Sequence, residues 1–119
     1  MGVQLRVTFP AGEPGWAAVA AKIVEAGESP VVRMIDGLPA FPDECPEDGW
    51  REVRVGFAAG MVTITRTPSE WRVTVWGTDD PALLRTQSAC AWAAAAAGEG
   101  VVHTDAGPLS PDAFRERLK

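Results

Sequence analysis

The chain contains 119 residues, 46% of them hydrophobic, and has a formal net charge of −5 at pH 7. This length and composition are typical of one globular domain, so we expect a single domain over residues 1–119. The acidic balance argues against binding to nucleic acids or anionic membranes, since both require a cationic surface. Abundant alanine, glycine and proline, with arginine in place of most lysines, indicate a GC-rich and therefore bacterial coding sequence.

Signals for export or membrane insertion are not evident. The N-terminal residues MGVQLRVTFP have no cationic flank ahead of a long apolar region, so no signal peptide is expected. The longest apolar run, 89–97, has nine residues, whereas a membrane-spanning helix needs about 20. We therefore expect a cytoplasmic protein, in which Cys45 and Cys90 remain free thiols.

The first third of the chain predicts a strand, a helix, a second strand and a loop. Residues 3–9 alternate apolar and polar side chains, which is typical of a strand. Residues 16–27 have apolar side chains at helical spacing and predict an amphipathic helix. After a strand at 30–36, residues 38–49 contain three prolines and four acidic residues, which predict a long exposed loop.

From residue 50 the apolar period becomes two. Residues 50–58, 61–67 and 71–77 predict three strands joined by short turns, an antiparallel meander with one face on the core. Trp71 and Trp76 occupy odd and even positions of the last strand. We therefore expect Trp71 in the core beside Val53 and Val62, and Trp76 on the opposite face.

The last third predicts a helix at 81–97, a strand at 100–105 and a short terminal helix. Thr78, Asp79 or Asp80 can cap the first helix, and its alanines allow close approach to a sheet. Ser110 is the expected cap of the terminal helix, with Phe114 and Leu118 on one side. The fold class is therefore α+β, a two-layer sandwich in which two main helices cover one face of a mainly antiparallel sheet of five to six strands.

His103 and Asp105 are the first candidates for chemistry, because positions i and i+2 of a strand point the same way. A histidine oriented by a carboxylate is a common general base, and Cys90 or Ser88 would be the nucleophile. No nucleophile-elbow motif surrounds Ser88, and the chain reverses between Cys90 and His103. We expect no functional dyad; an enzyme or small-ligand site near His103, Asp105 and Cys90 is the alternative.

Metal and cofactor motifs are also lacking. The acidic segment PDECPEDG offers oxygen ligands from Asp43, Glu44, Glu47 and Asp48, without the spacing or glycine of a calcium loop. The glycines form neither a dinucleotide-binding nor a Walker pattern. We expect no metal and no cofactor.

The strongest candidate is a surface. If both main helices cover one sheet face, the other exposes a tryptophan among arginines and threonines: Arg54, Arg72, Thr74 and Trp76. Tryptophan and arginine are enriched at the centres of protein interfaces. The sequence therefore predicts a non-enzymatic interaction domain, regulatory or neutralising, whose partner is another protein or a second copy in a homodimer.

Overall fold

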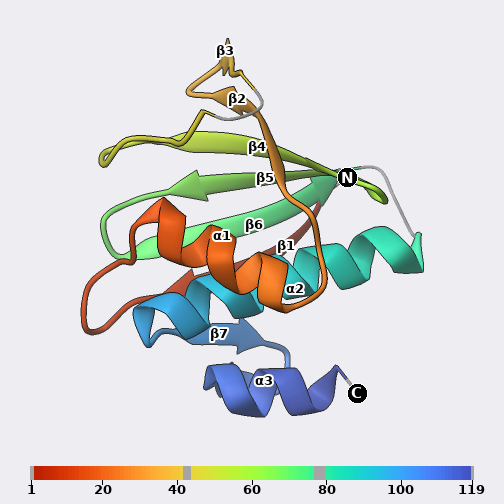
Figure 1. The fold of residues 1–119 in the computed structure, drawn as a ribbon. Helices are drawn as coiled ribbons and strands as arrows, with labels where there is room; N and C mark the ends of the chain where they lie inside the picture. Colours follow the sequence, from red (N-terminus) through yellow and green to blue (C-terminus); the bar gives the residue numbers. More distant parts are fainter. Residues whose placement is uncertain (1, 42–43, 77–79, 119) are drawn as a thin grey trace.

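A computed structural model describes residues 2–41, 44–76 and 80–118. Within these residues the chain is an α+β fold with one antiparallel sheet of eight strands and three helices. Figure 1 shows α1 and α2 lying against the same face of the sheet. The elements in chain order are β1 (Gly2–Thr8), α1 (Trp16–Glu25), β2 (Val31–Ile35), β3 (Leu38–Pro39), β4 (Glu52–Phe57), β5 (Gly60–Arg66), β6 (Glu70–Trp76), α2 (Pro81–Gly98), β7 (Val101–Thr104), β8 (Gly107–Leu109) and α3 (Pro111–Arg117).

The order of strands in the sheet is β3-β2-β4-β5-β6-β1-β7-β8. The meander of β4, β5 and β6 predicted from the sequence is confirmed, and each hairpin pairs in antiparallel register. The N-terminal strand β1 is not at an edge; it lies between β6 and β7. This long-range insertion brings the first residues of the chain to the middle of the sheet.

The predicted number of five to six strands was wrong. The two strands that the sequence did not indicate, β3 and β8, are the outermost in the sheet and are two and three residues long. Each contains a proline, Pro39 and Pro108, which is tolerated at a sheet edge because no second neighbour needs its missing N–H. Strands this short show no detectable alternation of apolar and polar residues. The whole segment 38–49 was therefore predicted to be a loop.

The helix ends follow their sequence signals. Asp80 accepts a hydrogen bond from the amide of Ala82 and caps α2, with Pro81 first in the helix; Thr78 and Asp79 lie outside the described residues. Ser110 caps α3 in the same way through the amide of Ala113. No helix of the described part combines the length and apolar character required to cross a lipid bilayer.

The alanine run places α2 directly on the sheet. Residues 90–95 of this helix are all buried, and the helix contacts β1, β5, β6 and β7. Gln87, also buried, donates from Nε2 to the carbonyl oxygens of Val3 at 2.7 Å and Val73 at 2.9 Å. The small side chains permit the close approach, and the glutamine amide ties the helix to β1 and β6.

Trp71 is fully buried (0% exposed), as the alternation predicts. Its aromatic neighbours are Phe9 and Trp50, with ring centroids 5.2 and 5.0 Å away in edge-to-face geometry. Its predicted neighbours Val53 and Val62 lie one and two rows of side chains further along the sheet, because the register sets Trp71 opposite Arg66. The placement in the core was right and the neighbours were wrong, since register across strands is not visible in one strand's sequence.

Candidate functional site

The sheet face away from α1 and α2 is called the open face here (Figure 1). Strand alternation and register place fourteen residues on it from the four central strands, and they form rows across the sheet. From β4 to β1 the rows are Gly56, Met61, Trp76 and Gly2; Arg54, Thr63, Thr74 and Gln4; Glu52, Thr65, Arg72 and Arg6; and, on β6 and β1 alone, Glu70 and Thr8.

Trp76 is the most prominent side chain of this face, with 64% of its surface exposed. The glycine opposite it on β1, Gly2, leaves room for the ring: a Cβ there would meet the Trp76 Cε3 atom at 2.8 Å. The β5–β6 register, continued beyond the Thr63–Thr74 pair, places Met61 on the other side of the ring. Met61 is 43% exposed, so these two side chains form an apolar end of the open face.

Thr74, expected to contact a partner, is only 4% exposed. Its hydroxyl accepts a hydrogen bond from Gln4 Nε2 at 3.3 Å, and its methyl group lies close to Gly2, beside the Trp76 ring. Its neighbour across the strands, Thr63, is equally buried. The threonines are thus the floor of the open face, and the longer side chains around them are its accessible surface.

Arginines and glutamates fill the rest of this face. Glu70 accepts hydrogen bonds from Arg6 at 3.3 Å and from Arg72 at 2.9 Å, one guanidinium for each carboxylate oxygen. Arg54 is exposed, and its side chain makes no ion pair within the described residues. Arg33 of β2 also reaches this face, since its Nε atom would lie 2.9 Å from a Cβ at Gly56.

Several of these residues were not anticipated. Gln4 and Arg6 reach the open face because β1 pairs with β6, and Arg33 reaches it because β2 pairs with β4. The period-two pattern of residues 3–9 shows that Gln4 and Arg6 share a face, but not which strand lies beside them. The missing information is the long-range strand order.

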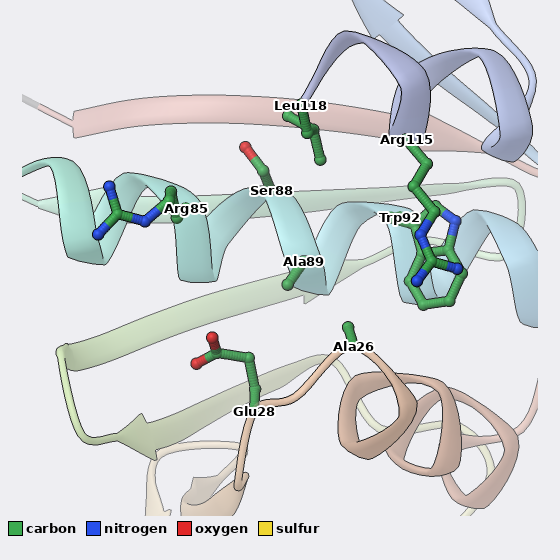
Figure 2. A pocket seen from close by; sticks show the side chains of 8 residues that line it. All are labelled: Ala26, Glu28, Arg85, Ser88, Ala89, Trp92, Arg115 and Leu118. Atoms are coloured by element: carbon green, nitrogen blue, oxygen red, sulfur yellow. The ribbon is translucent and has the colours of Figure 1, made fainter.

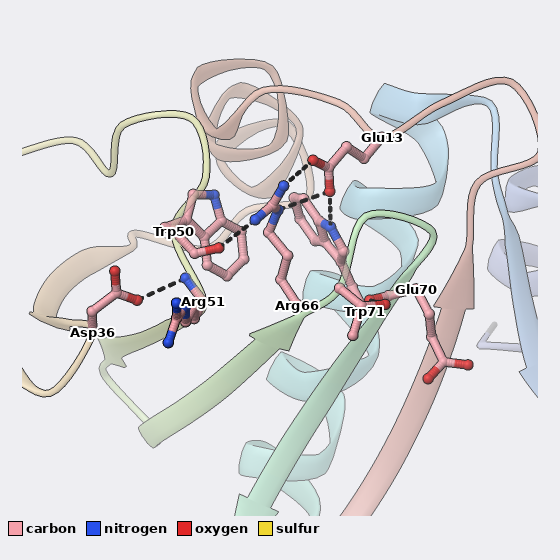
Figure 3. Close-up of polar contacts among 8 residues, drawn as sticks. Glu13, Asp36, Trp50, Arg51, Arg66, Glu70 and Trp71 are labelled. Carbon is pink, nitrogen blue, oxygen red and sulfur yellow. Dashed lines mark hydrogen bonds and ion pairs between the residues drawn. The ribbon is translucent and has the colours of Figure 1, made fainter.

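At one end of the sheet on the covered face, Glu13 joins three elements (Figure 3). Its carboxylate accepts hydrogen bonds from Arg66 Nε at 2.8 Å, from a second nitrogen of that guanidinium, and from Trp71 Nε1 at 3.1 Å. Arg66 also donates to the carbonyl oxygen of Trp50 at 2.6 Å. The hydrogen bond from Arg66 lowers the pKa of Glu13 below its ordinary value, and desolvation opposes it. This cluster of hydrogen bonds therefore has a structural role at the end of the core.

Asp36 has a local structural role. Its carboxylate accepts hydrogen bonds from the backbone amides of Arg51 at 2.7 Å and Glu52 at 2.9 Å, and these two bonds lower its pKa. They join the turn after β2 to the start of β4 (Figure 3).

The alternative catalytic residues are only partly brought together. Ser88, His103 and Asp105 line one pocket of about 550 Å³, together with residues from β1 and α3. The His103 ring nitrogen Nε2 is 2.9 Å from the Thr8 hydroxyl, and no hydrogen bond between His103 and Asp105 is found in the described residues. Cys90 is not part of this pocket; it is fully buried in α2, and desolvation strongly raises its pKa. A buried neutral thiol outside the pocket cannot serve as the nucleophile.

A second hollow of about 430 Å³ lies on the outer side of α2 (Figure 2). Its floor is formed by Ala89 and Trp92, and Arg115 of α3 lies over the Trp92 ring at 4.7 Å from the centroid. The Trp92 indole N–H is buried, and no described residue accepts a hydrogen bond from it. Leu118, expected on the same side of α3 as the buried Phe114, is about half exposed and lines this hollow.

Among the described residues, no group of three or more His, Cys, Asp or Glu side chains is arranged to hold a metal ion. Of the acidic segment considered for metal binding, Glu44, Glu47 and Asp48 are exposed, and Asp43 lies outside the described residues. Neither a protein-family model, a curated protein nor a solved structure matches this chain.

Proposed function

We propose that this chain is a non-enzymatic interaction domain that binds a protein partner through its open face. The observation that carries the proposal is the exposure of Trp76, 64% of whose surface faces solvent at the end of the central strand β6. An indole ring buries a large area when it enters an interface, and tryptophan is enriched at interface hot spots.

The surroundings of Trp76 support this role. Met61 extends the apolar area on one side, and beyond it, on β4 and β2, are Arg54 and Arg33, whose guanidinium groups can pair with carboxylates. The buried threonines Thr63 and Thr74 form the floor of this surface. An exposed apolar patch with a polar border is the usual composition of a protein-binding surface.

Selection from a displayed random-peptide library tests the proposal, with the wild-type chain as bait. We expect enriched peptides whose affinity falls at least about tenfold when Trp76 is replaced by Ala. Val24→Ala is the matched control, because Val24 is 60% exposed on α1, away from the open face. A selection that returns only peptides indifferent to Trp76→Ala contradicts the proposal.

Binding of a small ligand beside His103 is a second candidate, favoured by the pocket of about 550 Å³ that gathers Ser88, His103 and Asp105. Such a pocket lies within the volume range of ligand sites, about 300–1,000 Å³. A titration with acetate, followed by the NMR signals of the His103 ring, tests it. A saturable shift that is lost in Arg117→Ala, which removes another side chain lining the pocket, supports a site, and unchanged signals contradict it.

A further inference from the structure

The open face has a positive net charge, whereas the chain as a whole has a negative one. The net charge of the chain is −5. The open face, in contrast, carries four arginines, Arg6, Arg33, Arg54 and Arg72, against two glutamates, Glu52 and Glu70, a formal excess of two positive charges. The open face is therefore basic, and the rest of the chain is more acidic than the total indicates.

Two of these arginines are available to a partner. Glu70 satisfies both Arg6 and Arg72. Arg33 and Arg54 are exposed and make no ion pair within the described residues. These two lie at the end of the face where the apolar side chains are: Arg54 is on β4, and Arg33 lies over Gly56 of the same strand, which pairs with Met61.

We propose that the open face binds an acidic segment of another protein, with an apolar side chain of that segment against Trp76 and Met61 and carboxylates paired with Arg33 and Arg54. This proposal rests on the proposed function and names the chemistry of the partner. Arg54 on β4 lies two strands from β6 and is roughly 10 Å from Trp76. Arg33 is on β2, one strand further away, but its side chain extends back over Gly56 of β4. An extended segment spans the distance from Trp76 to Arg54 in about three residues, which sets the spacing between the apolar residue and the carboxylates.

A second copy of the chain bound face to face does not fit this surface. A two-fold contact sets the same patch against itself, so the excess of positive charge would be doubled in the interface instead of neutralised. Head-to-tail association is the remaining form of self-binding, with the acidic segment around Glu44, Glu47 and Asp48 of one copy on the open face of the next. Such contacts give rings where the rotation between copies closes and oligomers of increasing size where it does not.

The composition of the selected peptides tests the chemistry. Among peptides whose binding depends on Trp76, we expect acidic residues about three positions from an aliphatic or aromatic residue. We further expect Arg54→Glu to reduce the affinity for these peptides at least about tenfold. Arg85→Glu, which replaces an exposed arginine on α2, should leave the affinity unchanged. Neutral or basic peptides that depend on Trp76 overturn this proposal and leave the proposed function in place. The absence of any Trp76-dependent peptide overturns both.

Sedimentation equilibrium of the wild-type chain at low ionic strength tests self-binding. We expect a monomer at every concentration examined. A dimer that Trp76→Ala dissociates identifies a second copy as the occupant and overturns the proposal of an acidic partner, while supporting binding through this face. Oligomers of increasing size that dissociate in Arg54→Glu overturn it as well, because the acidic segment then belongs to the chain itself.

Discussion

The seven residues of β6 alternate between the two faces of the sheet, and the side chains on the two faces are buried for different reasons. On the covered face, Trp71, Val73 and Val75 are all fully buried within the core beneath the helices. On the open face, Thr74 is almost as buried, at 4% exposed, although α1 and α2 lie against the other face of the sheet (Figure 1). It is covered by its own neighbours on the sheet. Alternation therefore decides the face of a residue, whereas the size of its cross-strand neighbours decides its accessibility.

The largest expected difference between the faces concerns the two tryptophans of β6. Trp71→Ala removes a fully buried ring that packs against Phe9 and Trp50, together with one of the two hydrogen bonds to Glu13 Oε2. We expect unfolding free energy to fall by about 3–5 kcal/mol, and chemical denaturation measures it.

Trp76→Ala is the matched substitution on the open face and is expected to cost less than about 1 kcal/mol, since most of the ring is already in solvent. Similar losses in the two variants would contradict the assignment of Trp71 to the core and Trp76 to a free surface.

The next largest effect concerns a charged side chain on the covered face. Glu13 accepts hydrogen bonds there from Arg66 and Trp71. Glu13→Gln should lower the unfolding free energy by about 2–3 kcal/mol at neutral pH. The pKa of Glu13 is below its ordinary value of 4.5 in the folded chain. Its contribution is therefore complete above that value and is lost as the pH falls through the lower, folded value.

The difference between wild type and Glu13→Gln should consequently shrink on going from neutral to about pH 3, as the carboxyl group becomes protonated. Asp36, whose pKa is also lowered, loses its contribution in the same direction in both proteins and cancels in the comparison. Denaturation at a series of pH values measures the difference. A gap that is constant with pH would show that the ionised form of Glu13 is not the source of the stability.

The elements of the fold that local patterns specify were predictable from the sequence. The meander, the helix caps at Asp80 and Ser110, and the close packing of the alanine run follow from period-two alternation, capping chemistry and side-chain size. The short edge strands β3 and β8 were not predictable, because hydrogen bonding to a neighbour alone makes them strands. The position of β1 between β6 and β7 depends on contacts across the whole chain and has no local signal.

The candidate site was predictable to the same extent. Arg54, Arg72 and Trp76 follow from alternation within β4 and β6. Arg6 and Arg33 come from strands whose neighbours the sequence does not indicate, so the charge of the open face emerged only with the strand order. The burial of Thr74 was missed for the same reason, since Gln4 covers it from β1.

A moderate effect is expected within α2, which has a side toward the sheet and a side toward solvent. Ala94 is fully buried, and a leucine there would push the helix from the sheet at a cost of about 1–3 kcal/mol. Ala89 on the same helix lines the outer hollow of about 430 Å³, and Ala89→Leu should change stability by less than about 0.5 kcal/mol. Thermal unfolding of both variants compares them. Equal losses would contradict the tight packing of the alanine face.

The smallest expected effect on stability is at Gly2, where the open face depends on a missing side chain. A Cβ at this position would lie 2.8 Å from the Trp76 Cε3 atom and 3.1 Å from the Thr74 methyl carbon. Gly2→Ala therefore requires the indole ring to turn away from β1, while stability should change by less than about 0.5 kcal/mol because the ring is mostly in solvent.

The indole N–H signal of Trp76, identified by its loss in Trp76→Phe, should shift in a proton–nitrogen NMR spectrum. The indole signal of buried Trp71 should not move and serves as the internal control. A Trp76 signal at the same position in Gly2→Ala and wild type would mean that the ring does not rest over Gly2, and that the flat apolar end of the open face is not formed as described.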